Sequence, residues 1–106
     1  MVIIKTEKYK RDLKKLEKKY KKEFENNEKI ENHIKVCRNL EELKLNVMSR
    51  VYNFEKLKGN NDKYWSFNLC KNRGTIRLIC TVNEEENVVN LEHISFDHYK
   101  SLRKCK

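Results

Sequence analysis

The fold is decided by the stretch Trp65-Ser66-Phe67-Asn68-Leu69-Cys70-Lys71-Asn72-Arg73-Gly74-Thr75-Ile76-Arg77-Leu78-Ile79-Cys80-Thr81-Val82, where apolar side chains recur at every second position. This period is typical of a half-buried β-strand, because successive side chains point to opposite faces of a sheet. We expect one strand over 65–70 and a second over 75–82, joined by a turn in which Gly74 can take a positive φ.

One face of each strand is expected to be buried. On the first strand the inward set is Trp65, Phe67 and Leu69, and on the second it is Ile76, Leu78, Cys80 and Val82. Arg77 therefore falls on the opposite face. An acidic turn follows at 83–87, and a third strand is predicted over 88–95. Together the three strands predict an antiparallel meander.

A helical period replaces the strand period in the N-terminal half of the chain. After a short strand at Val2–Ile4, Thr6 can cap a helix. The apolar stripe of this helix is Tyr9, Leu13, Leu16, Tyr20 and Phe24. Asn26-Asn27 interrupts the stripe, and a second helix is expected to bury Ile30, Ile34 and Cys37. A third, short helix capped by Asn39 would turn Leu40, Leu43 and Val47 inward.

These elements predict a single α+β domain over residues 1–106. The expected order is β-α-α-β-β-β: an N-terminal strand, a helical hairpin packed on one face of an antiparallel sheet, and a short C-terminal helix or tail after Phe96. Because the hairpin covers one face of the sheet, the other face is left to bind a ligand or carry out chemistry.

The charge balance indicates a polyanionic partner. Lys and Arg number 25 against 16 Asp and Glu, a formal net charge of +9, and most of the excess lies on the first predicted helix. Nucleic acid is the favoured partner, since Lys and Arg release counterions when they neutralise phosphates. An acidic protein would satisfy the same field. An anionic membrane would not, because no basic helix here has an exposed apolar face.

The sequence predicts a cytoplasmic protein that uses no cofactor. No apolar run is long enough to span a membrane, and the first residues do not form a signal peptide. The four Cys residues form no CxxC pair, which argues against a metal site, because zinc sites need closely spaced ligand pairs. Cys37 and Cys80 are expected to be buried.

Several short segments resemble the RelE/ParE toxin superfamily. Phe54-Glu55-Lys56-Leu57-Lys58-Gly59 followed by Tyr64-Trp65-Ser66-Phe67 is similar to the family's Leu-Lys-Gly segment and its first meander strand. Arg73-Gly74-Thr75-Ile76-Arg77-Leu78-Ile79 resembles the family strand that carries a characteristic arginine, here Arg77. Val88-Val89-Asn90-Leu91 is similar to the closing strand, and Asp97-His98-Tyr99 to the His- or Tyr-containing tail.

The resemblance implies one of two activities. RelE-, YoeB- and HigB-like members are endoribonucleases that cut messenger RNA, commonly within the ribosome, whereas the ParE branch inhibits DNA gyrase and is not a nuclease. Fold alone does not choose between them. For either toxin, the expected partner is a cognate antitoxin that binds in a hetero-oligomer. A basic nucleic-acid-binding module without toxicity is the third possibility.

For the nuclease, the resemblance implies a catalytic set of Arg77, His98 and Tyr99. A planar guanidinium can hold two phosphate oxygens at once, and histidine exchanges protons near neutral pH. Tyr99 can transfer a proton or stack on a base. The structural alternatives are that Arg77 pairs with Glu84 or Glu92, while Tyr99 anchors the tail and His98 is solvated.

Further candidates surround this set. Lys56, Lys58, Lys71 and Arg73 are predicted to hold RNA phosphates, although charged turns are usually solvated. Asn68 and His93 are predicted to line the site. We expect His93 to share a face with Leu91, Val89 and Ser95, which favours a structural role. Some relatives place catalytic lysines on the first meander strand, where this chain has Ser66, Asn68 and Cys70.

Overall fold

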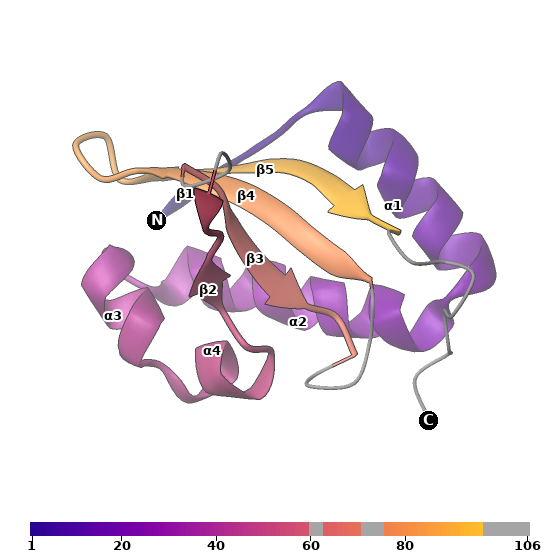
Figure 1. The fold of residues 1–106 in the computed structure, drawn as a ribbon, viewed down its shortest axis with the longest axis horizontal. Coiled ribbons are helices and arrows are strands. Elements are labelled where there is room, and N and C mark those ends of the chain that lie inside the picture. Colours follow the sequence, from indigo (N-terminus) through magenta and orange to yellow (C-terminus); the bar gives the residue numbers. More distant parts are fainter. Residues whose placement is uncertain (60–62, 71–75, 97–106) are drawn as a thin grey trace.

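The computed structural model describes residues 1–59, 63–70 and 76–96. The elements follow the order β1 (Val2–Lys5), α1 (Glu7–Lys19), α2 (Lys21–Val36), α3 (Leu40–Leu45), α4 (Val47–Val51), β2 (Glu55–Lys56), β3 (Trp65–Asn68), β4 (Arg77–Asn83) and β5 (Val88–Ser95). The chain thus has the predicted α+β class, and Figure 1 shows α1 beside β5 and α2 alongside the sheet. None of the helices described is both long and apolar enough to cross a bilayer.

The five strands form one open, mixed sheet in the order β1-β5-β4-β3-β2. The meander β3-β4-β5 is antiparallel, as predicted. The sheet is not antiparallel throughout, because β1 pairs with β5 in parallel, with Val2 opposite Val88 and Lys5 opposite Leu91. Nearly the whole chain separates these two strands, and parallel neighbours need a long connection of this kind. β2, a two-residue edge strand, was not predicted.

The first helix ends at Lys19, five residues before the end of the apolar stripe at Phe24. Thr6 caps α1 as predicted, its hydroxyl accepting from the Tyr9 backbone N–H. The backbone leaves the helical region at Tyr20, and α2 begins at the next residue. Asn26 and Asn27, expected to separate the two helices, instead lie inside α2 and are buried.

Tertiary hydrogen bonds explain why these asparagines do not break α2. The Asn26 amide donates to the Leu69 carbonyl oxygen at 2.7 Å and accepts from the Tyr52 hydroxyl at 3.1 Å. The Asn27 amide donates to the Tyr9 hydroxyl at 2.6 Å. Asparagine weakens helices by bonding to nearby backbone, and partners in other elements remove that competition.

The third predicted helix is divided in two. Asn39 caps α3 as expected, and Leu40 and Leu43 are buried. Asn46 ends α3 and caps α4 by accepting from the Met48 backbone N–H at 3.0 Å. The helical stripe therefore does not continue, and Val47, predicted to point inward, is 68% exposed.

The core lies between the helices and one face of the sheet. Its sheet residues are Phe67, Leu69, Ile76, Leu78, Cys80, Val89, Leu91 and Ile94. On the helical side, Ile30, Ile34 and Cys37 are buried together, as predicted. The prediction that strand 65–70 is only half-buried is wrong, because Ser66, Asn68 and Cys70 are also buried. β3 is an interior strand, with β2 and β4 on either side.

A side chain of α1 covers part of the edge of β5. The last pair between β1 and β5 is Lys5 with Leu91, because the chain leaves β1 after Lys5 and enters α1. Beyond this point the Ile94 backbone N–H donates to the Asp12 carboxylate at 3.0 Å. The Thr6 hydroxyl donates to the Glu92 carbonyl oxygen at 2.6 Å. These bonds fix α1 beside the end of the sheet that carries Arg77.

Candidate functional site

Arg77 lies on the face of the sheet opposite to the helices. It is the first residue of β4, directly across from Asn68 on β3 and from Ser95 on β5. The next residue, Leu78, is fully buried in the core, so the alternation of the strand turns Arg77 outward. Its side chain is exposed, as predicted. Asn68, the other residue predicted to line the site from this part of the sheet, is its direct cross-strand neighbour.

His93 also lies on the Arg77 face, which corrects the predicted placement. The pairing of β4 with β5 shifts between Ile79 and Cys80, so that Ile79 lies across from His93 while Cys80 lies across from Leu91. This bulge adds one residue to β5 and reverses the alternation beyond it. As a result Leu91 and Ile94, three residues apart, are both in the core. His93 therefore lies on the face opposite to Leu91.

The bulge places His93 and Ser95 on the same face as Arg77, next to residues of β3 and β4 of which Ser66, Asn68 and Ile79 are buried. Asn68, Arg77 and Ser95 form one row across β3, β4 and β5, and Ser66, Ile79 and His93 form the adjacent row. Residues directly opposite each other have Cβ atoms about 5 Å apart, and diagonal neighbours are about 7–8 Å apart. His93 and Arg77 are diagonal neighbours, so both can reach one ligand. We call these two rows the Arg77 face.

No carboxylate in the described part of the chain makes an ion pair with Arg77. Glu92, one of the two partners considered, accepts a hydrogen bond from the Thr81 hydroxyl at 2.7 Å instead. The other, Glu84, lies in the exposed turn between β4 and β5, beyond the far end of β4. The guanidinium thus remains available to an anion, which it can grip with two parallel N–H donors.

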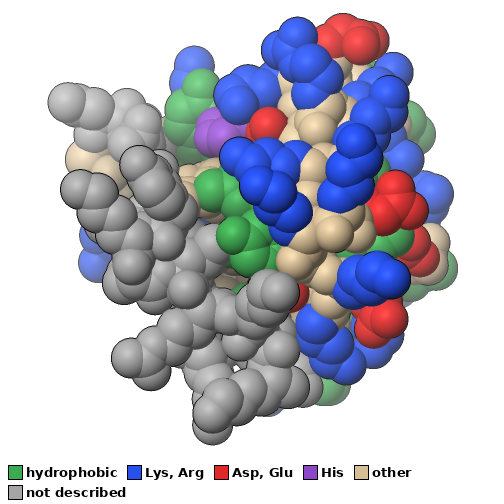
Figure 2. Space-filling view, turned by 90° about the vertical axis from the view of Figure 1, so that its right-hand side faces the viewer, with side chains coloured by type: hydrophobic (Ala, Val, Ile, Leu, Met, Phe, Trp, Pro, Cys, Tyr) green, Lys and Arg blue, Asp and Glu red, His purple; other side chains and the backbone are tan. Residues whose placement is uncertain are grey.

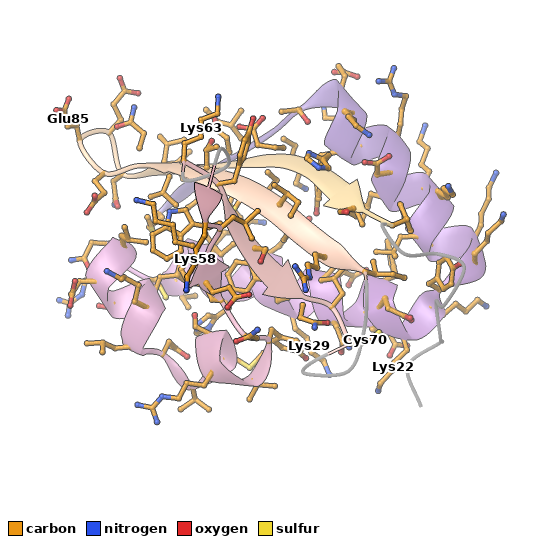
Figure 3. The ribbon with its side chains drawn as sticks, viewed as in Figure 1. Lys22, Lys29, Lys58, Lys63, Cys70 and Glu85 are labelled. Carbon is orange, nitrogen blue, oxygen red and sulfur yellow. The ribbon has the colours of Figure 1, made fainter. Side chains whose placement is uncertain are left out.

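Two of the predicted RNA-binding lysines, Lys56 and Lys58, lie apart from Arg77. Lys56 pairs with Trp65 across β2 and β3, and so shares the face of Trp65 rather than that of Arg77. Its ammonium lies 6.0 Å from the centroid of the Trp65 ring. Lys58 is exposed, and Figure 3 places it near β2, away from the start of β4.

Four residues proposed for the site fall outside the described ranges. They are His98, Tyr99, Lys71 and Arg73. Ser66 and Ser95, which the sequence reading did not propose as site residues, are the additional polar members of the Arg77 face. Strand alternation alone identifies Ser66 as a neighbour of Asn68, whereas Ser95 and His93 join them only because of the bulge.

The buried thiols lie elsewhere and are unreactive. Cys37 and Cys80 are free and buried, as predicted. Burial, aided by the negative charge of Glu92, raises the pKa of Cys80 to about 12. Burial likewise raises the pKa of Cys37. Because the thiolate is the reactive form, neither group is suited to act as a nucleophile. No cluster of three metal-ligating side chains occurs among residues 1–59, 63–70 and 76–96.

Several solved bacterial proteins have a similar fold. The YoeB/ParE toxin from Agrobacterium tumefaciens has a TM-score of 0.67 at 15% identity, over 92% of this chain and 100% of that one. YafQ from E. coli strain BL21(DE3) has a TM-score of 0.66 at 15% identity, over 93% and 96%. YoeB in the YoeB–YefM complex from Staphylococcus aureus has a TM-score of 0.64 at 20% identity, over 92% and 98%.

At the level of sequence, no protein-family model matches the chain, and no curated protein matches it either. The similarity to these proteins is therefore one of three-dimensional structure. It extends over nearly all of this chain and nearly all of each toxin, and it agrees with the resemblance of the short segments around Arg77. The chain has the same fold as these YoeB and YafQ structures.

Proposed function

We propose that this protein is the toxin of a type II toxin–antitoxin system and a metal-independent endoribonuclease that cuts messenger RNA, bound to the ribosome in the cytoplasm. The observation that carries the proposal is the Arg77 face. An exposed guanidinium, which has no carboxylate partner among the described residues, lies beside Asn68, Ser95 and His93 on a sheet face opposite to the helices. Small toxins with this fold supply the context.

The reaction requires a cation that binds the phosphate and two proton transfers. The RNA 2′-OH loses its proton to a general base as its oxygen bonds to phosphorus, and the P–O5′ bond breaks as a general acid protonates the leaving oxygen. Arg77 is suited to bind the charged phosphate as the transition state forms. His98 and Tyr99 are proposed for the proton transfers, and His93 is a third candidate because the bulge places it diagonal to Arg77.

The proposed protein partner is a cognate antitoxin, held in a hetero-oligomer. One of the structures with the same fold is a complex of YoeB with YefM, and another is a heterotetrameric YoeB–YefM toxin–antitoxin complex. A charge of +9 complements an acidic polypeptide. An antitoxin segment laid across the Arg77 face would exclude RNA from it.

A gyrase inhibitor without nuclease activity is the second candidate. The basic α1 helix supports it, because an inhibitor of a DNA-bound enzyme needs a positive surface and no catalytic group. A basic nucleic-acid-binding module without toxicity is the third. The gyrase reading gives no role to the exposed Arg77 with polar neighbours on both flanking strands, and the binding module uses it only to hold a phosphate.

Induced expression in a bacterial host tests the proposal. We expect growth arrest, relief by co-expression of the neighbouring open reading frame, and new 5′ ends within translated messages by primer extension. Intact messages together with altered plasmid supercoiling would select the gyrase inhibitor. Normal growth with abundant soluble protein would leave only the binding module.

A further inference from the structure

The solvent face of α1 carries a dense group of exposed basic residues. Seven of its 13 residues are basic: Lys8, Lys10, Arg11, Lys14, Lys15, Lys18 and Lys19. Tyr9 and Leu16 hold the helix on the core, so these side chains point away from it. Figure 2 shows Lys and Arg covering much of the side of the molecule where α1 lies.

Four of these residues form a straight stripe on the side of α1 that adjoins β5. Lys8, Arg11, Lys15 and Lys18 follow one another at intervals of three, four and three, and all are exposed. Ten residues of α-helix rise about 15 Å, so the stripe is long enough to follow several backbone phosphates. Its position is fixed because Asp12 binds the Ile94 backbone N–H and because the Lys15 ammonium lies 4.7 Å from the centroid of the Phe96 ring.

Most of the stripe is uncompensated. On α1, Lys8 pairs with Asp12 at 3.3 Å and Lys10 pairs with Glu7 at 3.5 Å. Within the described residues no carboxylate makes an ion pair with Arg11, Lys15 or Lys18. Three like charges on one rigid helix repel one another, and a ligand with closely spaced negative charges would relieve that repulsion.

We propose that this stripe, defined as Lys8, Arg11, Lys15 and Lys18, is a docking surface for the sugar-phosphate backbone of RNA. An acidic helical peptide would need apolar anchor residues, and an anionic membrane would need an apolar face. Of the large apolar side chains exposed in the described chain, which are Val2, Ile4, Val36, Leu45 and Val47, none lies on α1. A row of cations on a helix that exposes no large apolar side chain fits phosphates best.

The stripe extends the proposed nuclease site, and the inference rests on the proposed function to that extent. Ser95 lies directly across from Arg77, and the adjacent Ile94 is bonded to α1 through Asp12. An RNA strand whose phosphate is held by Arg77 therefore has to pass only the end of β5 to reach the stripe. In this arrangement Arg77 acts at the reacting phosphate, and the stripe holds a distant part of the same RNA.

Salt-dependent binding tests the surface. The triple variant R11Q/K15Q/K18Q is compared with K29Q/K35Q/R50Q, which removes one Arg and two Lys from exposed positions on α2 and α4. The probe is a fluorescein-labelled 20-nucleotide single-stranded RNA, followed by anisotropy from low to high salt. Each phosphate contact contributes about 0.7 to the slope of log K against log salt for a single strand, so the stripe variant should lose about 2 from that slope. The control should keep the slope of the unaltered protein.

Equal losses of slope in the two triple variants would overturn the proposal, because net charge alone would then account for binding. Tighter binding of a polyglutamate peptide than of RNA, with the same dependence on the stripe, would overturn it in favour of an acidic protein partner. If the triple variant unfolds at a lower temperature than the unaltered protein, the double variant R11Q/K18Q replaces it in the salt titration, because it keeps the contact of Lys15 with Phe96.

Measurements on the unaltered protein and the stripe variant test the docking surface and the proposed nuclease activity separately. A stripe variant with unchanged slope, in a protein that cleaves RNA, would refute the docking surface alone. An unaltered protein that shows the expected slope difference but cleaves no RNA would refute the nuclease alone. We expect Arg77→Ala to lose cleavage while losing less than about 1 from the slope, since it removes a single phosphate contact.

Discussion

Two polar regions of this protein contrast in their surroundings. On the Arg77 face, an exposed cation has polar neighbours and, in the described chain, no carboxylate partner. Inside the molecule, a second polar group lies between α1, α2 and β1. There the Tyr9 hydroxyl donates to the Glu31 carboxylate and accepts from the Asn27 amide, and Lys5 pairs with Glu31 at 3.1 Å. We call this second group the Tyr9 network.

The difference between the two regions separates function from stability. Buried polar groups cost free energy unless they are paired, so the pairing of the Tyr9 network indicates a structural role. Arg77 faces outward and makes no ion pair within the described chain, so those residues give it little part in stability. Its value lies in what it can bind. Substitutions in the two regions should therefore separate into losses of activity and losses of stability.

The largest effect is expected at Arg77. Arg77→Ala should lower the rate of messenger RNA cleavage about 100-fold or more, because it removes charge from the site where negative charge develops. Arg77→Lys should retain part of the activity, since an ammonium is a point charge without the two-pronged grip. Single-turnover cleavage measures both rates. Thermal melting should be unchanged in both variants, and a large drop in melting temperature would mean that Arg77 is structural.

The next largest effect is expected at Asn26. Asn26→Ala would leave the Leu69 carbonyl oxygen and the Tyr52 hydroxyl without their partners in the core, at a cost of about 2–4 kcal/mol in the free energy of unfolding. Urea denaturation measures it. Asn32→Ala, an exposed position on the same helix, is the matched control and should change stability by less than about 0.5 kcal/mol. Equal effects at the two positions would contradict the buried placement of Asn26.

A smaller and pH-dependent effect is expected in the Tyr9 network. Tyr9→Phe should cost about 1–2 kcal/mol near neutral pH, because the Asn27 amide and the Glu31 carboxylate lose a partner. Burial, followed by the hydrogen bond to Glu31, raises the pKa of Tyr9 well above its usual value. The unfolded chain therefore ionises first, and this contribution to stability is complete below about pH 10 and is lost as the pH rises above it. The difference in unfolding free energy between the two proteins should shrink over that range, and a constant difference would exclude the buried phenol.

The smallest effect is expected at Val47. Val47→Ser should change the free energy of unfolding by no more than about 0.5 kcal/mol, since the side chain is 68% exposed. Leu43→Ala, on the preceding helix and fully buried, is the contrasting variant and should cost about 2–5 kcal/mol. A loss at Val47 as large as that at Leu43 would show that α4 turns its first residue inward.

Strand periodicity predicted the part of the candidate site that depends on alternation alone. Arg77 and Asn68 follow from the inward positions of Leu78 and Phe67, and both predictions agree with the register of β3 and β4. His93 does not follow, because a single extra residue in β5 reverses the faces of everything beyond it. The pattern Val89, Leu91, Ile94 does contain the signal, since an apolar spacing of three within a strand indicates a bulge.

The sequence predicted the helix caps correctly but misplaced the two buried asparagines, and the distance along the chain to the bonding partner explains both outcomes. Thr6 and Asn39 cap helices as predicted, because a cap is a local bond between a side chain and a backbone N–H two or three residues away. Asn26 and Asn27 were misassigned as an interruption because their partners come from residues remote in the chain, including Tyr52 and Tyr9. Local patterns cannot detect such partners.

The sequence by itself determined the α+β class, the positions of the strands in the meander, the capping of α1 and the outward direction of Arg77. These features depend on the spacing of apolar side chains and on short-range hydrogen bonds, both of which involve residues close together in the sequence. Only the tertiary structure decided the parallel pairing of β1, the burial of two asparagines within α2, the face of His93 and the position of α1 beside the candidate site. Those features depend on contacts between segments far apart in the chain, whose geometry is set when the whole core packs.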